Sequence, residues 1–274
     1  MLCVLALVCA FGPPLCRMLG LDGESIDLAR RLAPPGPHAP LGTDELGRDL
    51  LVRLLEGGRI SLAVGVGGAL ATTLLGTLLG VWAALARGTI DALVMRIGDV
   101  LLALPLLPLL VVLAALDPGE LGLPAELDST ALEVGRIVLL VALFGWPATA
   151  RLVRAGTLSL ESAEFVRAAR ALGASPMWVA RRHLVPNLAG PLGVAAALAA
   201  GQAILAESVL SFLGLGIRPP AASWGNMLSH AQEVMWQAPL LALWPGLAIL
   251  LAVIAWNALG DALAERADPR ARRR

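Results

Sequence analysis

The sequence predicts an all-α integral membrane protein with six transmembrane helices. Of its 274 residues, 57% are hydrophobic and only 15% are charged, whereas soluble proteins carry about a quarter charged residues. Several apolar runs reach the roughly 20 residues that a spanning helix needs, and they are continuous rather than alternating, which disfavours a β-barrel. The predicted spans are residues 2–19, 60–86, 97–116, 134–153, 191–213 and 239–260.

The first span is the least typical of the set. Residues 2–19 carry Pro13-Pro14, and the chain ahead of Arg17 reaches only about 24 Å as a helix, which is short for a span. We therefore expect a short leader ahead of Met1. All three cysteines lie in this span, where they act as small apolar residues without metal or disulfide spacing.

The segment ahead of the second span predicts a helix on the membrane surface. In residues 43–57, leucines recur on one side and charged side chains occupy the other. Thr43 is expected to cap the start of this helix and Gly57-Gly58 to end it. The span that follows, residues 60–86, carries no charge, and its small residues predict close packing within the bundle.

Charged side chains also occur in or near other spans. Arg96 and Asp99 stand at i, i+3 near the start of the third span, and an ion pair between them would lower the cost of charge near lipid. We predict a structural pair, with a direct gating role as the alternative. Glu207 is the one carboxylate well inside a predicted span, where it either lines a substrate pathway or hydrogen-bonds within the bundle.

A polar, arginine-rich segment, residues 161–187, separates the fourth and fifth spans. Gly173 is expected to end its first helix, and a second short helix begins at Ser175-Pro176 and runs to Pro186. A helix–Gly–helix unit between spans predicts a docking surface, with an ordinary solvated loop as the alternative. The apolar residues of the first helix recur at i, i+3, i+4 and i+7 and form one face: Phe165, Ala168, Ala169 and Leu172.

Residue usage argues against several classes of function. All 21 basic residues are arginine, and without lysine the chain can form neither a Walker A phosphate loop nor a Schiff base. No Ser/His/Asp or Cys/His set stands on a common side, so we predict no enzyme activity. The histidines do not cluster, so we predict no metal site: they are His38, His183 and His230.

The distribution of arginine predicts that both termini are cytoplasmic. An even number of spans places the termini on one side, and the segments on that side would be 87–96, 151–190 and 261–274. They hold 13 arginines, against 8 in the opposite segments. Positive residues favour the cytoplasmic side of a membrane.

These segments resemble a known family, the permease subunits of bacterial ABC importers for dipeptides, oligopeptides and nickel, and in particular the second (C-type) of their two membrane subunits. The loop RAARALGASPMWVARRHLVPN resembles the family's cytoplasmic EAA loop, with Arg167 in place of the usual Glu, Gly173 as the key glycine, and Val185-Pro186 followed by Asn187 as its close. Four further stretches are similar to the family: residues 41–62, 91–105, 205–228 and 245–270.

The resemblance implies the fold of a type I ABC importer transmembrane domain (MetI-like). The permease core would be residues 59–261, preceded by the first span and the outside helix at 1–58 and followed by a basic cytoplasmic tail at 262–274. The loop would couple to a separate ATPase, which holds ATP and Mg²⁺, so that this chain binds no cofactor itself. The residues implied in coupling are Phe165, Arg167, Ala168, Ala169, Arg170, Leu172, Gly173, Pro186 and Asn187.

The resemblance also implies partners in a bacterial inner membrane. These are a second related permease, two ABC ATPase subunits and an extracytoplasmic binding protein that delivers a di- or oligopeptide; no nucleic acid is implied. The outside loop Gly214–Trp236 and residues 43–58 are candidates for contact with the binding protein. Nickel or another small solute is the alternative cargo. An ion-driven secondary carrier, a different class, should show an internal repeat and paired intramembrane charges, which the sequence lacks.

Overall fold

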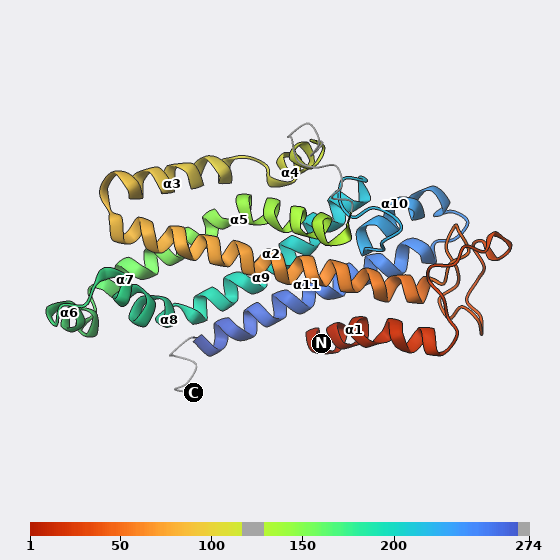
Figure 1. Ribbon diagram of the computed structural model, residues 1–274, viewed down its shortest axis with the longest axis horizontal. Coiled ribbons are helices and arrows are strands. Elements are labelled where there is room, and N and C mark those ends of the chain that lie inside the picture. The colour runs from red at the N-terminus through yellow and green to blue at the C-terminus, as the bar shows by residue number, and fades with distance from the viewer. Residues whose placement is uncertain (117–128, 268–274) are drawn as a thin grey trace.

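The computed structural model describes residues 1–116 and 129–267, and its regular elements there are all helical, as the sequence predicts. Figure 1 shows the long helices lying along one axis, with α6, α7 and α8 at one end and residues 19–49 and α10 at the other. The helices are α1 (Leu2–Met18), η1 (Leu28–Arg30), α2 (Leu50–Ala86), α3 (Gly88–Ala103), α4 (Leu106–Ala114), α5 (Thr130–Glu161), α6 (Glu164–Ala171), α7 (Pro176–Val179), η2 (Ala180–Leu184), α8 (Val185–Asn187), α9 (Ala189–Phe212), α10 (Trp224–Val234) and α11 (Leu240–Ala267).

Four helices of the described chain, α2, α5, α9 and α11, are each long and apolar enough to cross a membrane. α3 and α4 together pass the same test, but they meet at an angle of 90°, so they form either one broken span or a re-entrant pair. α1 is apolar but has only 17 residues. The membrane-embedded helical fold is therefore confirmed. The predicted count of six spans is not confirmed, because the described residues give four spans, or five if α3 and α4 form one.

The predicted surface helix at residues 43–57 is wrong. The regular helix begins after Asp49, whose carboxylate caps it by accepting a hydrogen bond from the backbone N–H of Val52 at 3.0 Å. Thr43 does not cap a helix; its hydroxyl accepts a hydrogen bond from the backbone N–H of Ala33 at 2.8 Å. A carboxylate directly before an apolar run satisfies the first free N–H groups, which explains why Asp49 sets the boundary.

The glycine pair at positions 57 and 58 does not end this helix. α2 continues through Gly57 and Gly58 without a break, and so it also crosses the expected boundary between residues 58 and 59. A Cβ on Gly57 would lie 3.1 Å from the backbone carbon of Ser223, and one on Gly58 would lie 2.9 Å from the Trp224 ring. These glycines therefore allow the segment at Ser223 and Trp224 to pack closely against α2, and they do not break the helix.

The core of the bundle is built where α2 packs against α5 and α9. A Cβ on Gly76 would lie 2.6 Å from Cβ of Thr149, and one on Gly80 would lie 2.5 Å from the carbonyl oxygen of Ala150. The predicted close packing of the second span is thus confirmed, because α5 occupies the space that larger residues would need. Further along the bundle, the buried side chains of Val64, Ile137, Val141, Ala203 and Leu210 form the largest apolar cluster of the described residues.

Candidate functional site

The segment between α5 and α9 has the helix–Gly–helix form that the sequence predicts. α6 ends at Ala171, and Gly173 takes a left-handed conformation with φ of 87°, which turns the chain away from the α6 axis. α7 then starts at Pro176, after Ser175 accepts a hydrogen bond from the backbone N–H of Trp178 at 3.3 Å. η2, a short π-helix, and α8 continue the second arm to α9.

One side of this loop, residues 161–187, is anchored to the bundle. The anchor is an apolar cluster of fully buried Val166, Val179, Ala180 and Leu184, with the partly buried Ala169 beside it. This cluster packs against the ends of α2 and α5. The sequence pattern missed Val166, because it marks the face that holds Phe165, Ala168, Ala169 and Leu172, and the structure leaves all of these exposed except Ala169.

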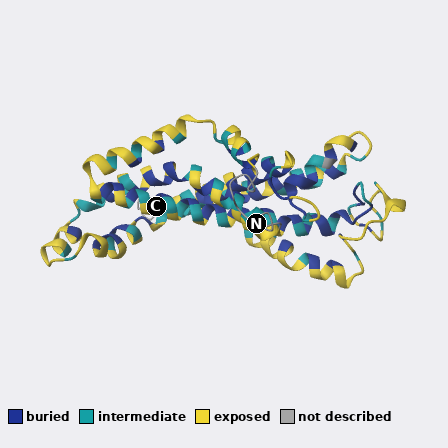
Figure 2. Cartoon of the chain, turned by 45° about the horizontal axis from the view of Figure 1, so that its top comes forward, coloured by how far each residue is buried: buried dark blue, intermediate teal, exposed yellow. Residues whose placement is uncertain are grey.

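The outward side of the loop presents large apolar and basic side chains. Leu172 is 90% exposed and Phe165 43%, and Arg167, Ala168 and Arg170 are exposed with them. Figure 2 shows the tip that holds α6 mostly in the colour of exposed residues. A surface with large exposed apolar side chains and arginine is typical of a protein–protein interface.

The second arm of the loop extends this outward surface. Met177 is 64% exposed and Trp178 50%, and together with the exposed Arg181 and Arg182 they line an open cavity of about 510 Å³. The His183 ring lies between the two arms, with its centroid 5.7 Å from that of Phe165 and 5.1 Å from that of Trp178. The exposed Pro186 and Asn187 lie in α8, where the Asn187 side chain donates to the His183 carbonyl oxygen.

Ion pairs fix the loop at residues 161–187 to the neighbouring helices. The Glu161 carboxylate, at the end of α5, accepts a hydrogen bond from Arg87 at 2.7 Å and another from Arg170 of α6. Arg87 connects α2 to α3, so one carboxylate joins three segments. Asp91 of α3 also binds Arg154 of α5, with Nη2 and Oδ2 2.6 Å apart. The loop, α3 and α5 are thus held together at this end of the bundle.

The predicted ion pair between Arg96 and Asp99 is wrong. Asp99 pairs with Arg151 of α5, and Arg96 is exposed and forms no ion pair with the described residues. The i, i+3 spacing puts Arg96 and Asp99 on one side of α3, but Asp99 faces the adjacent helix, which supplies an arginine of its own.

Glu207 lies at the centre of a buried hydrogen-bond network near the opposite end of the bundle. Its side chain is fully buried, and its two carboxylate oxygens accept hydrogen bonds from Ser61 at 2.9 Å and Ser211 at 2.7 Å. Each serine hydroxyl accepts in turn from a backbone N–H of the segment that follows α9, Trp224 for Ser61 and Ile217 for Ser211. Of the two roles that the sequence left open, this geometry favours hydrogen bonding within the bundle, while a role in the pathway stays untested.

Replacing Glu207 with glutamine should destabilise the protein by about 1–3 kcal/mol. Both serines donate to the carboxylate and accept from backbone N–H groups, so the amide NH₂ of glutamine would face a hydroxyl whose proton then lacks an acceptor. The measurement is thermal unfolding of the purified protein in detergent. Glu233→Gln, on an exposed position of α10, is the matched control and should leave the transition unchanged. Equal transitions for both variants would contradict the role of the network.

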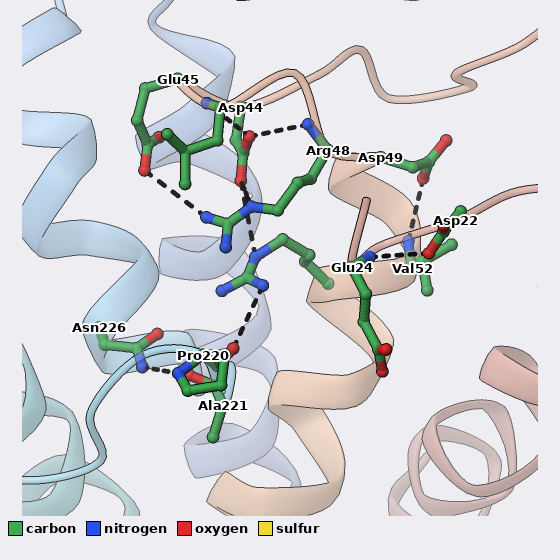
Figure 3. Close-up of polar contacts among 12 residues, drawn as sticks. Asp22, Glu24, Asp44, Glu45, Arg48, Asp49, Val52, Pro220, Ala221 and Asn226 are labelled. Carbon is green, nitrogen blue, oxygen red and sulfur yellow. Dashed lines mark hydrogen bonds and ion pairs between the residues drawn. The ribbon is translucent and has the colours of Figure 1, made fainter. Parts of the chain in front are cut away.

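A second polar network joins the two segments that are candidates for outside contacts. Figure 3 shows the Asp44 carboxylate turned toward Arg48, whose Nε lies 2.7 Å from it. Buried Arg53 of α2 reaches the same carboxylate at 3.6 Å and donates to the carbonyl oxygen of Pro220 at 3.5 Å. Residues 43–58 and the loop Gly214–Trp236 are therefore linked directly.

Two carboxyl groups beside this network have shifted pKa values. The backbone N–H of Glu24 donates to Asp22 at 2.8 Å and lowers the pKa of that carboxyl group. Burial raises the pKa of Asp49, and one of its oxygens has no hydrogen-bond partner in the described structure.

In residues 1–116 and 129–267, no three His, Cys, Asp or Glu side chains converge as metal ligands would.

A bundle of apolar, membrane-length helices with a helix–Gly–helix loop at one end is typical of a membrane transport subunit. The chain belongs to the family of binding-protein-dependent transport system inner membrane components, whose model matches residues 76–273. The predicted resemblance is confirmed, and the chain is a multi-pass permease subunit of an ABC importer.

Similar proteins come from several bacteria. A protein of Brucella suis biovar 1 (strain 1330), named "Putative peptide permease protein", is 42% identical over 250 residues, which cover 90% of this chain and 78% of that protein. The glutathione transport system permease protein GsiD of Pectobacterium atrosepticum is 40% identical over 255 residues, covering 92% and 80%. GsiD of Escherichia coli O6:K15:H31 is 41% identical over 230 residues, covering 84% and 71%.

A solved structure shares the fold. The chain matches one chain of the MetNI methionine ABC transporter in inward-facing conformations with a TM-score of 0.60 and 20% sequence identity. The match covers 78% of this chain and 96% of that chain. It confirms the type I importer fold that the sequence resemblance implies.

Proposed function

We propose that this permease couples to its ATPase through the outward surface of residues 161–187. The observation that carries the proposal is a loop that is anchored on one side by Val166 and its buried neighbours, and that presents Phe165, Leu172 and Trp178 on the other. Exposed apolar side chains of this size stabilise a complex when a partner covers them. The arginines beside them can pair with acidic groups on the partner's rim.

This assignment places the coupling loop in the cytoplasm, together with both termini. The arginine-rich side of the membrane agrees with it, since the cytoplasmic segments then hold 13 arginines and the outside segments 8. The Asp44–Arg53 network and the loop Gly214–Trp236 then face the outside, where a binding protein would dock. ATP and Mg²⁺ would be held by the ATPase subunits, so the chain acts as a non-catalytic partner in hydrolysis.

Peptides are the cargo that we propose. The relatives named for peptide and glutathione transport are 40–42% identical to this chain over most of its length, which supports a small peptide as the transported molecule. The assembly would contain a second, related permease, two ATPases and an extracytoplasmic binding protein. Nickel or another small solute remains the alternative cargo. An ion-driven secondary carrier is the more remote alternative for the class of transporter.

Affinity purification from the native host tests the assembly. The tagged chain, extracted in a mild detergent, should carry a second permease and ABC ATPase subunits, identified by mass spectrometry. Recovery of the folded chain alone at normal abundance would contradict the proposal and favour a self-sufficient carrier.

Uptake into proteoliposomes that contain the recovered complex tests the cargo. With the binding protein outside and ATP inside, a labelled dipeptide or oligopeptide should accumulate, and Ni²⁺ should not. Accumulation of Ni²⁺ without peptide would replace the proposed cargo and leave the coupling assignment in place.

A further inference from the structure

A cavity of about 320 Å³ lies at the end of the molecule opposite the loop at residues 161–187 (Figure 1). It is lined by residues from 44–53 and 219–227 and by Leu241 at the start of α11. Its volume is within the range of sites for small ligands. In the proposed orientation the cavity is on the outside of the membrane, where cargo arrives.

Buried Arg53 lines this cavity with most of its hydrogen-bond donors unused. Its side chain is only 7% exposed, and among the described residues its guanidinium makes one hydrogen bond, a long one of 3.5 Å to the carbonyl oxygen of Pro220. Its contact with the Asp44 carboxylate, at 3.6 Å, is too long for a hydrogen bond. A guanidinium has five N–H donors, and burying its charge is costly unless partners replace the lost water. The position therefore requires a further acceptor.

The acids and amides nearby do not supply this acceptor, because other groups already occupy them. One oxygen of Asp44 accepts from the backbone N–H groups of Leu46 and Arg48, both at 2.9 Å, and the other accepts from Nε of Arg48 at 2.7 Å. The Asn226 side chain, also in the lining, is hydrogen-bonded to three backbone groups of its own segment. These two side chains shape the cavity and leave its ligand to others.

The polar groups that remain carry charges of both signs. The Nη atoms of Arg48 make no hydrogen bond to the described residues, and one of them lies 3.8 Å from Oε1 of Glu45. Figure 3 shows the Glu45 carboxylate turned toward this guanidinium. Glu45 accepts no hydrogen bond within the described structure, and its side chain is 21% exposed. The cavity thus offers two guanidinium groups and one carboxylate to a ligand.

The remaining wall and the overall charge define the ligand further. Five residues form an apolar wall: Leu46, Leu50, Pro219, Met227 and Leu241. The described lining holds two acids and two arginines, so a ligand without net charge leaves the cavity neutral. A simple anion would satisfy the arginines but would face the Glu45 carboxylate. A molecule with a carboxylate, an ammonium group and an apolar side chain satisfies all three surfaces, and a free short peptide is such a molecule.

We infer that this cavity is a binding site on the permease for free peptide, in which Arg53 and Arg48 hold the terminal carboxylate and Glu45 holds the terminal ammonium group. The inference rests on the proposed function, since it requires peptide cargo. Guanidinium groups bind a carboxylate through charge-assisted hydrogen bonds, which are stronger than neutral ones. Because the site recognises the two ends, it favours a short peptide whose ends are both free.

Equilibrium binding of labelled peptides to the complete complex in nanodiscs, without binding protein or nucleotide, tests the role of each end. The unmodified complex should bind alanyl-leucine about tenfold more tightly than the same dipeptide with an amidated carboxyl end, which is the effect of one charge-assisted hydrogen bond. In Arg53→Gln this preference should fall to about twofold or less. Glu45→Gln should keep it and lose instead the preference for a free over an acetylated amino end.

Comparing two peptides on each variant also controls for folding, because a damaged fold would lower both affinities by the same factor. Arg31→Gln is the matched protein control. Arg31 is exposed near the same end of the molecule and does not line the cavity, so this variant should keep the preference of the unmodified complex. Equal binding of acid and amide by the unmodified complex, a preference that survives in Arg53→Gln, or its loss in Arg31→Gln would each overturn the site.

Cysteine labelling tests whether the peptide lies in the cavity. In a chain with Cys3, Cys9 and Cys16 replaced by alanine, Leu46→Cys, in the partly buried lining, should react with a membrane-impermeant thiosulfonate, and saturating alanyl-leucine should slow that reaction severalfold. Leu28→Cys is the control, because Leu28 is 66% exposed outside the lining and peptide should not change its rate. No reaction at Leu46→Cys, or the same rate with and without peptide, would contradict the assignment.

The outcomes separate the site from the proposed function. A complex that takes up peptide when its binding protein is present, but binds no free peptide without it, would overturn the site and leave the proposed cargo in place. A complex that takes up no peptide under any of these conditions would overturn both.

Discussion

Uptake by the assembled transporter should fall at least about tenfold when Gly173 is replaced with valine, while the ATPase subunits remain able to hydrolyse ATP. Gly173 holds a φ of 87°, a conformation that costs a β-branched residue about 1–2 kcal/mol or more. The turn between α6 and α7 would relax to another geometry and move Phe165 and Trp178 relative to each other. A partner that contacts both arms of the loop would then bind it less tightly.

Gly20→Val provides the matched control for this experiment. Gly20 also has a positive φ, of 77°, and like Gly173 it has no atom within 4 Å of an added side-chain carbon, so the backbone strain is similar. It lies after α1, at the end of the molecule opposite the coupling loop (Figure 1). Uptake and ATP hydrolysis should be measured for both variants in proteoliposomes. Similar losses of uptake in both would mean that strain alone, and not coupling, explains the result.

Replacing Gly80 with leucine should prevent the bundle from assembling. Even the first side-chain carbon at this position would lie 2.5 Å from the carbonyl oxygen of Ala150 and 2.9 Å from Cβ of Val153. Backbone cannot move aside as a flexible side chain would, so we expect a destabilisation of about 3 kcal/mol or more. The amount of protein in the membrane and its thermal unfolding in detergent measure this effect.

Gly135→Leu is the control for the Gly80 substitution. Gly135 lies in α5, and no atom lies within 4 Å of an added side-chain carbon, so leucine there should leave both measurements near those of the unmodified protein. A stable, abundant Gly80→Leu variant would mean that α2 and α5 are further apart than the structure places them.

Patterns among residues close together in the sequence predicted those parts of the structure that local sequence determines. The apolar runs predicted the spanning helices, and the order of glycine, serine and proline at residues 173–176 predicted where one arm of the loop ends and the next begins. The same rules failed at Gly57-Gly58, because a glycine pair that packs against Trp224 cannot be distinguished by sequence from one that ends a helix.

Contacts between distant segments could not be predicted in the same way. The arginine that pairs with Asp99 comes from a different helix, and Ser61, a partner of Glu207, lies 146 positions away in the chain. Val166 belongs to the anchored side of the loop only because α2 and α5 end beneath it.

The bonds around Glu207 all point in one direction. Backbone N–H groups of Ile217 and Trp224 donate to serine hydroxyls, and those hydroxyls donate to a single carboxylate. Residues 217–224 are therefore hydrogen-bonded to both α2 and α9 around this one buried carboxylate. In the proposed orientation, a binding protein docked on residues 217–224 would therefore contact a segment that is hydrogen-bonded to two spanning helices at once, through Ser61 to α2 and through Ser211 to α9.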